Sequence, residues 1–183
     1  MIQEKGTISV STDNIFPIIK KFLYSEQEIF LRELISNAVD ATTKLKTLSN
    51  RGEVKGELTN LNIEIIADTE AKTLTIRDRG IGMTEEEVNK YLNQVAFSSA
   101  QEFMDKYKDE ASIIGHFGLG FYSAFMVSDK VEVVTKSYKE NSVGVKWTCN
   151  GETDYTIENV EKTERGKDII LFLNEECQTY LEN

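Results

Sequence analysis

The chain contains few of the residues that form disulfides, break helices or bind metals. Among its 183 residues there are two cysteines, one proline, one tryptophan and one histidine. Two cysteines cannot build a disulfide framework or a zinc cluster, so Cys149 and Cys177 are interpreted as reduced thiols of a cytoplasmic protein. His116 has no second histidine with which to share a metal, and it is interpreted as a loop residue.

Long apolar runs and an excess of positive charge are lacking as well. No run is long enough to span a bilayer and the N-terminus shows no signal-peptide core, so no membrane association is expected. The chain has 21 basic and 31 acidic residues, a formal net charge of −10. This balance argues against nucleic-acid binding, and an anionic nucleotide would need a metal ion and backbone donors nearby.

The order of expected elements predicts one domain, 1–183, with an α+β two-layer fold. Strands are expected where apolar and polar residues alternate, at 7–10, 61–67, 72–78, 130–138, 143–149, 154–159 and 168–173. Helices are expected at 14–24, 26–48, 85–94 and 121–127. Helices concentrated early and strands late predict helices packed on one face of a largely antiparallel mixed sheet.

The helix expected at 26–48 carries an apolar stripe and a separate polar row. The stripe recurs at helical spacing: Leu31, Leu34, Ile35, Ala38 and Leu45. Glu33, Asn37 and Asp40 lie at i, i+4 and i+7 and therefore share another face. Taken alone, this row is equally compatible with ordinary solvated helix charges.

Asp78 is expected at the end of a strand, directly before Gly80 and Gly82. Two glycines in three residues let the backbone bend sharply and approach a ligand without an intervening side chain. Thr84 and Glu87 then form the capping box of the next helix. Alone, this segment would favour a plain strand–turn–helix connection.

A second glycine segment contains Gly115, Gly118 and Gly120 and opens an apolar helix. Unpaired backbone N–H groups and the helix dipole favour an anion at such a place, which predicts a phosphate-binding loop. It is not a P-loop, because no Gly-Lys-Ser or Gly-Lys-Thr follows. It is a poor dinucleotide fingerprint, because Ser123 stands at the third glycine position. A flexible hinge loop remains the alternative.

Together the three motifs resemble the signature shared by gyrase B, the mismatch-repair protein MutL, histidine kinases and heat-shock protein 90 chaperones. The stretches 24–38 and 114–124 look most like the chaperones, and the resemblance covers 7–181. It implies a Bergerat-type ATP-binding and ATP-hydrolysing domain of a bacterial heat-shock protein 90 chaperone. In that family, binding of Mg-ATP drives lid closure and the chaperone cycle.

The resemblance implies a role for each motif residue. Glu33 would be the general base that polarises the attacking water, and Asn37 would hold Mg²⁺ through its amide oxygen. Asp78 would accept a hydrogen bond from the adenine amino group, beside Gly82, and Asp40 would lie near the ribose. The apolar adenine slot would comprise Ala41, Ile81, Met83, Leu92, Phe121 and Ile169. Backbone N–H groups toward phosphate would come from Gly118, Gly120 and Phe121.

The resemblance also implies parts and partners. The segment 93–120 would be a lid that folds over bound ATP. The family's middle and C-terminal dimerisation domains are absent from this chain, and the middle domain supplies an arginine, so hydrolysis by this domain alone should be slow. Expected partners are adenine nucleotide, client proteins and that middle domain. The full-length protein is expected to be a homodimer and this domain a monomer.

Alternatives and departures from the family pattern stay open. The alternatives are the ATP domain of a histidine kinase or of a DNA-handling ATPase, and a nucleotide sensor with little turnover. Arg79 stands where threonine or asparagine is usual, Phe97 where many relatives have lysine, and His116 where glutamine is common. Lys167 replaces a threonine that usually helps to bind a water on the adenine side, so that water network is expected to be altered.

Overall fold

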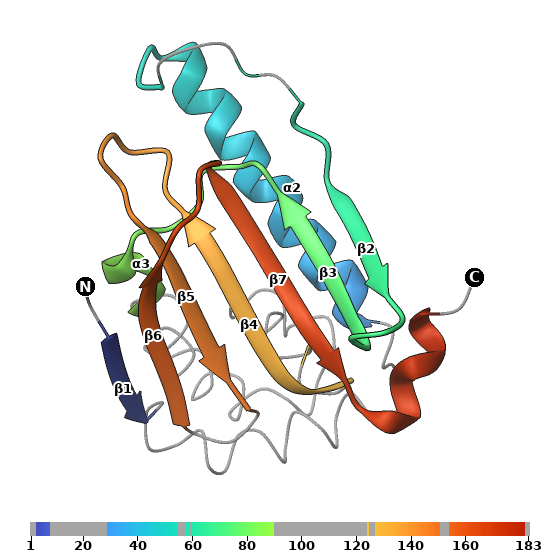
Figure 1. Ribbon diagram of the computed structural model, residues 1–183. Helices are drawn as coiled ribbons and strands as arrows, with labels where there is room; N and C mark the ends of the chain where they lie inside the picture. The colour runs from blue at the N-terminus through green and yellow to red at the C-terminus, as the bar shows by residue number, and fades with distance from the viewer. Residues whose placement is uncertain are drawn as a thin grey trace, which may run out of the picture.

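The computed structural model describes residues 3–7, 29–54, 58, 60–89, 124, 127–150 and 154–181. The described strands form one sheet (Figure 1): β1 (Gln3–Thr7), β2 (Glu64–Asp68), β3 (Thr73–Asp78), β4 (Ser128–Lys136), β5 (Gly144–Cys149), β6 (Asp154–Val160) and β7 (Gly166–Leu173). Their spatial order is β1-β6-β5-β4-β7-β3-β2, and every pair is antiparallel. The described helices are α2 (Ile29–Asn50), α3 (Glu85–Val88) and the 3₁₀ helix η4 (Glu175–Leu181).

Alternation along the strands builds one buried face of the sheet. The strand register aligns a row of apolar side chains across five strands, each at most 1 % exposed: Ile76, Ile169, Val133, Trp147 and Ile157. Asp78 follows Ile76 by two residues and therefore lies on the same face. A carboxylate thus lies at the end of β3, on the same face as this apolar row.

Helix α2 covers this face beside β3, as Figure 1 shows. Its buried side chains include Phe30, Leu34, Ala38 and Leu45, which recur on one side of the helix. Thr42 completes the stripe, because its hydroxyl donates to the Ala38 carbonyl at 2.9 Å and is satisfied within the helix. The predicted helix layer on a largely antiparallel sheet is confirmed.

The β2–β3 hairpin is confirmed, and its turn is held locally. Asp68 Oδ1 accepts hydrogen bonds from the backbone N–H groups of Glu70 and Ala71, both at 3.0 Å. The predicted capping box is also present, since Thr84 accepts from Glu87 N and the Glu87 carboxylate accepts from Thr84 N. Each motif depends on residues three or fewer apart, which is why sequence alone could predict it.

The start of the first strand was missed, and of the predicted range only Thr7 lies among the described residues. It was expected at 7–10, but β1 spans Gln3–Thr7 and pairs with β6. The segment is polar, and pairing at a sheet edge depends on backbone hydrogen bonds, so apolar alternation was the wrong signal there. The described β4 also begins two residues earlier than predicted, at Ser128. The helices predicted at 14–24 and 121–127 fall largely or wholly outside the described residues.

In the described part of the chain, no helix is long and apolar enough to cross a membrane. Neither cysteine is in a disulfide, and both are buried, Cys149 in β5 and Cys177 in η4. This agrees with their interpretation as reduced thiols.

Candidate functional site

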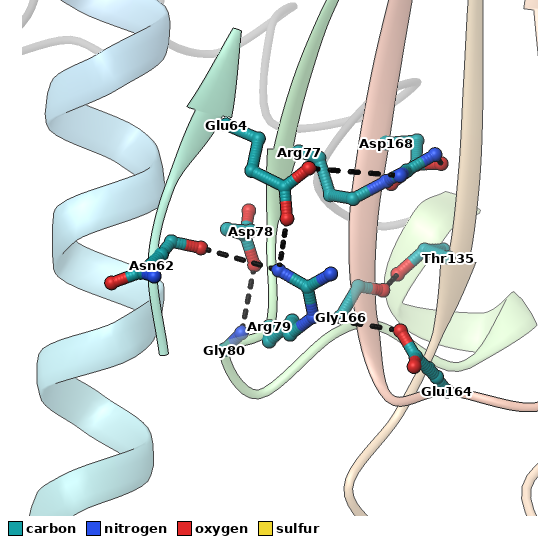
Figure 2. A network of polar contacts seen from close by, with 10 residues as sticks. All are labelled: Asn62, Glu64, Arg77, Asp78, Arg79, Gly80, Thr135, Glu164, Gly166 and Asp168. Carbon is teal, nitrogen blue, oxygen red and sulfur yellow. Dashed lines mark hydrogen bonds and ion pairs between the residues drawn. The ribbon is translucent and has the colours of Figure 1, made fainter. Parts of the chain in front are cut away.

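Asp78, the last residue of β3, is a buried carboxylate with an unused acceptor atom. Its side chain is 1 % exposed, and Oδ1 accepts a hydrogen bond from Gly80 N at 2.9 Å (Figure 2). Within the described part of the chain, Oδ2 has no hydrogen-bond partner. A buried polar atom left without a partner is costly, so this acceptor is available to a hydrogen-bond donor.

The charge of Asp78 reflects opposing influences. Burial raises the pKa of this carboxyl above its ordinary value and is the largest influence. Lys167, the Gly80 N–H and Lys162 act in the opposite direction, while Asp168 adds to the rise in pKa. Lys167 comes closest as a counter-ion, with Nζ 3.9 Å from Oδ2.

The loop after Asp78 contacts α2 at Ala41. A Cβ on Gly80 would lie 2.5 Å from the Ala41 carbonyl carbon, so only glycine permits this approach. Ile81 N donates to the Ala41 carbonyl at 3.3 Å. The structure thereby brings Ala41 of one motif against Gly80 and Ile81 of the other, two segments about forty residues apart in the chain.

The same loop is held on its other side by the end of β4. Gly82 has φ +63°, and a Cβ there would run into the Lys136 carbonyl. Tyr138 N donates to the Ile81 carbonyl at 2.8 Å. Met83 N donates to Thr135 Oγ1 at 3.0 Å. Gly82 is therefore required both by its backbone conformation and by its close neighbour.

The start of β7 forms the third support. The Thr135 hydroxyl donates to the Gly166 carbonyl at 2.8 Å, so this buried side chain joins β4, β7 and the Asp78 loop. Gly166 has φ +121°, and a Cβ there would collide with the Asp78 carbonyl. Arg165 Nε donates to the Arg79 carbonyl at 3.1 Å. Residues 78–83 are thus fixed by three separate elements.

Arg79 itself is engaged by carboxylates. Its guanidinium donates to Glu64 Oε1 at 2.7 Å and lies 3.5 Å from Glu164 Oε2 (Figure 2). These contacts raise the pKa of Arg79, with the Glu64 hydrogen bond as the largest cause. Nearby, Arg77 makes two hydrogen bonds of 3.0 Å to Asp168. Arg79, which stands where the family usually has threonine or asparagine, is therefore held in an ion-pair network around the end of β3.

The polar row of α2 has a different environment. Glu33 and Asn37 are partly exposed and Asp40 is exposed. Among the described residues, none of the three side chains has a hydrogen-bond or ion-pair partner. Because Ala41 contacts the Asp78 loop, the row runs back along α2 from that loop. Glu33 lies eight residues before Ala41, about 12 Å along the helix axis.

The expected apolar slot is described only in part. Ile81 and Met83 are partly exposed, and Met83 packs against the hydrophobic core. Ile169 is 1 % exposed and pairs across the sheet with Ile76 and Val133. The other proposed ligand contacts, Leu92, Gly118, Gly120 and Phe121, lie outside the described residues, as do the lid segment 93–120, Phe97 and His116.

Sequence reasoning missed the role of Thr135. The strand pattern could have indicated this role, because alternation places the Thr135 hydroxyl on the same buried face as Val131 and Val133. Lys167 was noticed only as a departure affecting water. Its position opposite Asp78 depends on the pairing of β3 with β7, which the sequence does not display.

The described residues contain no group of three or more His, Cys, Asp or Glu side chains that could hold a metal. Magnesium does not need such a cage. It is commonly bound through one or two protein oxygens together with phosphates and waters. A single amide oxygen at Asn37, beside partly exposed Glu33, fits that kind of site.

Comparison with known proteins relates the chain to one protein family. Residues 24–176 match the family described as histidine kinase-, DNA gyrase B-, and HSP90-like ATPase. The chain is 60% identical over 181 residues to "Chaperone protein HtpG" of Porphyromonas gingivalis, covering 98% of this chain and 26% of that protein. The proteins of the same name from Bacteroides thetaiotaomicron and Aliivibrio fischeri are 61% and 47% identical, covering 98% and 87% of this chain.

The chain spans about a quarter of the length of these curated relatives, 26% in each case. The family match extends from before α2 to η4 and so includes the Asp78 loop and all strands except β1. The chain therefore belongs to the family of histidine kinase-, DNA gyrase B- and HSP90-like ATPases, and its ATP-binding domain is of the HSP90 type.

Proposed function

We propose that this domain binds adenine nucleotide at Asp78 and hydrolyses ATP slowly, as the nucleotide-binding part of an HSP90-type chaperone. The observation that carries the proposal is the Asp78 carboxylate, buried and fixed at the end of β3, with Oδ2 unused among the described residues. Such an atom needs a hydrogen-bond donor if its burial is to be offset, and a bound nucleotide base can supply one.

The chemistry of Asp78 favours adenine over guanine. An ionised carboxylate can only accept hydrogen bonds. Adenine carries an amino group, which is a donor, where guanine carries a carbonyl oxygen, which is an acceptor. Oδ2 would therefore pair with the adenine amino group and would face an acceptor in guanine. Ile81, Met83, Ile169 and Ala41, together with Leu92 and Phe121, are proposed to contact the base through apolar surface.

The polar row of α2 is proposed to act on the remainder of the nucleotide. Asp40 lies nearest the base-binding loop in this row and is assigned to the ribose, Asn37 to Mg²⁺ and Glu33 to the attacking water. Mg²⁺, when bound, would offset phosphate charge. The Glu33 carboxylate would accept the proton of water, for which it must be reachable by solvent, and it is partly exposed. Gly118, Gly120 and Phe121 would donate backbone N–H groups to phosphate.

The wider protein is proposed to follow its relatives. The segment 93–120 would close over ATP, and a middle domain would capture the closed lid and supply an arginine. Client proteins would be the substrates of the whole chaperone, a homodimer in the cytoplasm. Support comes from 60% identity to a protein named as a chaperone.

Calorimetric titration with ADP, ATP and GTP, each with and without Mg²⁺, tests the proposal. We expect ADP and ATP to bind, Mg²⁺ to strengthen binding, and GTP to bind about fivefold to more than a hundredfold more weakly, from a mismatch of roughly 1–3 kcal/mol. Slow release of free phosphate from ATP should accompany binding. Equal affinity for GTP would contradict the base assignment. Transfer of labelled phosphate to a protein would indicate a kinase, and tight binding without phosphate release would indicate a sensor.

A further inference from the structure

Lys167 stands directly across the sheet from Asp78. The two residues are partners in the antiparallel register of β3 and β7. Lys167 Nζ lies 3.9 Å from Asp78 Oδ2, and the lysine side chain is 16 % exposed. A lysine so far removed from water loses hydration, which indicates that its position opposite the carboxylate compensates for that loss.

The distance between the Lys167 ammonium and the Asp78 carboxylate shows which kind of interaction joins them. At 3.9 Å the ammonium is close enough for strong Coulomb attraction at a buried site. It is beyond the roughly 2.7–3.2 Å of an N–H···O hydrogen bond. Lys167 therefore supplies charge without occupying the lone pairs of Oδ2, which has no hydrogen-bond partner in the described structure.

The protonation state of Asp78 decides what it can recognise. A carboxyl group buried without a counter-ion takes up a proton, and a proton on Oδ2 would turn the acceptor into a donor. A donor there would face the amino group of adenine, which is also a donor. We propose that Lys167 is a positioning residue for nucleotide recognition, whose ammonium keeps Asp78 ionised while leaving Oδ2 available to the base. This inference rests on the proposed function.

The other groups around Asp78 cannot replace Lys167. Lys162, in the loop before β7, and the Gly80 N–H also favour the ionised form, but Lys167 has the larger effect. The negative charge of Asp168 disfavours the ionised form of Asp78. Asp168 is itself paired with Arg77 through two hydrogen bonds of 3.0 Å. Helix α2 faces this loop with Ala41, which is uncharged. Burial raises the pKa of Asp78 overall even with these cations present, so loss of its closest counter-ion would raise that pKa further.

The test compares Lys167→Met, which keeps an unbranched chain but removes the charge, with Lys167→Arg, which retains it. Lys146→Met is the matched control, because Lys146 also lies in a strand and pairs with a carboxylate, Glu132 at 2.9 Å. ADP affinity is measured by calorimetry from pH 5 to 8. The ¹³C signal of the Asp78 carboxyl, assigned by its loss in Asp78→Asn, is titrated without nucleotide.

In the parent chain, ADP affinity should be full above the pKa of Asp78 and fall as the pH drops through it. Removing the positive neighbour should raise that pKa by about 1–3 units, because an opposite charge at this range shifts a carboxyl by that amount. Lys167→Met should therefore bind ADP about tenfold to a thousandfold more weakly than the parent below both midpoints, by a factor that shrinks between them, and equally well above both. The arginine variant and the Lys146→Met control should titrate like the parent.

Two results would overturn the inference. One is an unchanged carboxyl midpoint in Lys167→Met. The other is an equal loss of ADP affinity at every pH, which would mean direct contact with the nucleotide or general damage. If the parent bound no ADP at any pH, the proposed function would fail, whereas the carboxyl titration would still decide whether Lys167 controls the ionisation of Asp78.

Discussion

The Asp78 loop and the polar row of α2 would serve the same nucleotide, yet the fold treats them differently. The loop 78–83 is fixed by α2, β4 and β7, and its carboxylate is 1 % exposed. The side chains of Glu33, Asn37 and Asp40 are partly or fully exposed and have no partner among the described residues. A residue that recognises a base binds it more tightly when the fold has already fixed its position. Residues that handle a hydrated cation and a water must remain reachable by solvent.

Glu33→Ala tests the solvent-facing side of this contrast. Loss of a general base should slow ATP hydrolysis by roughly a hundredfold to ten-thousandfold. ADP affinity should change little, since the proposed partner of Glu33 is water. Phosphate release under single turnover and calorimetry measure the two effects separately. Glu53→Ala, at an exposed site just after α2, is the control. Loss of ADP binding in Glu33→Ala would assign Glu33 a structural role.

Asp78→Asn tests the role of the buried carboxylate in the loop 78–83. Asparagine places an amide donor where the base also donates, and an unmet buried polar group costs about 1–3 kcal/mol or more. ADP affinity should fall by about fivefold to more than a hundredfold, beyond detection if the parent affinity is modest. Circular dichroism should show an intact fold. Asp129→Asn, at an exposed position of β4, is the matched control. Near-parent ADP affinity in a folded Asp78→Asn chain would rule out the assignment.

Gly82→Ala tests whether the fixed conformation of the loop 78–83 is needed for stability and ADP binding. A side chain at φ +63° costs about 1–2 kcal/mol, and here the Cβ would also strike the Lys136 carbonyl. Gly52→Ala is a close control, because Gly52 has φ +77° but a Cβ on it would meet no atom within 4 Å. Thermal unfolding should show a larger loss of stability for Gly82→Ala, together with weaker ADP binding. Equal losses would mean that the contact with β4 is unimportant.

The smallest effect is expected at the proposed lid. Amide hydrogen exchange across 93–120 should slow more with a non-hydrolysable ATP analogue than with ADP. Phe97 cannot donate to phosphate, so its contribution would come from buried surface, up to ~1.5–3 kcal/mol. Phe97→Lys should make the protection more sensitive to salt, because a lysine–phosphate contact is screened. Identical exchange in the free, ADP-bound and analogue-bound full-length protein would remove the lid proposal.

Local patterns predicted much of this structure. The turn at Asp68, the capping box at Thr84 and the place of Asp78 at a strand end each depend on residues close together in the chain. Residues 3–6 of the first strand escaped prediction because an edge strand of polar residues carries no apolar alternation. Thr135 escaped because its two hydrogen bonds reach residues 52 and 31 positions away.

By itself, the sequence determined the class of fold and the place of Asp78 at a strand end, because periodicity, glycine positions and capping are short-range properties of the chain. The family followed from the resemblance of the three motifs. Only the tertiary structure decided which groups surround the Asp78 carboxylate. Pairing of β3 with β7 sets Lys167 opposite Asp78, and packing of α2 sets Ala41 against Gly80. Those contacts follow from strand register and helix packing, which arise when distant segments bury their apolar faces together. The charge state of Asp78 is consequently a property of the folded molecule.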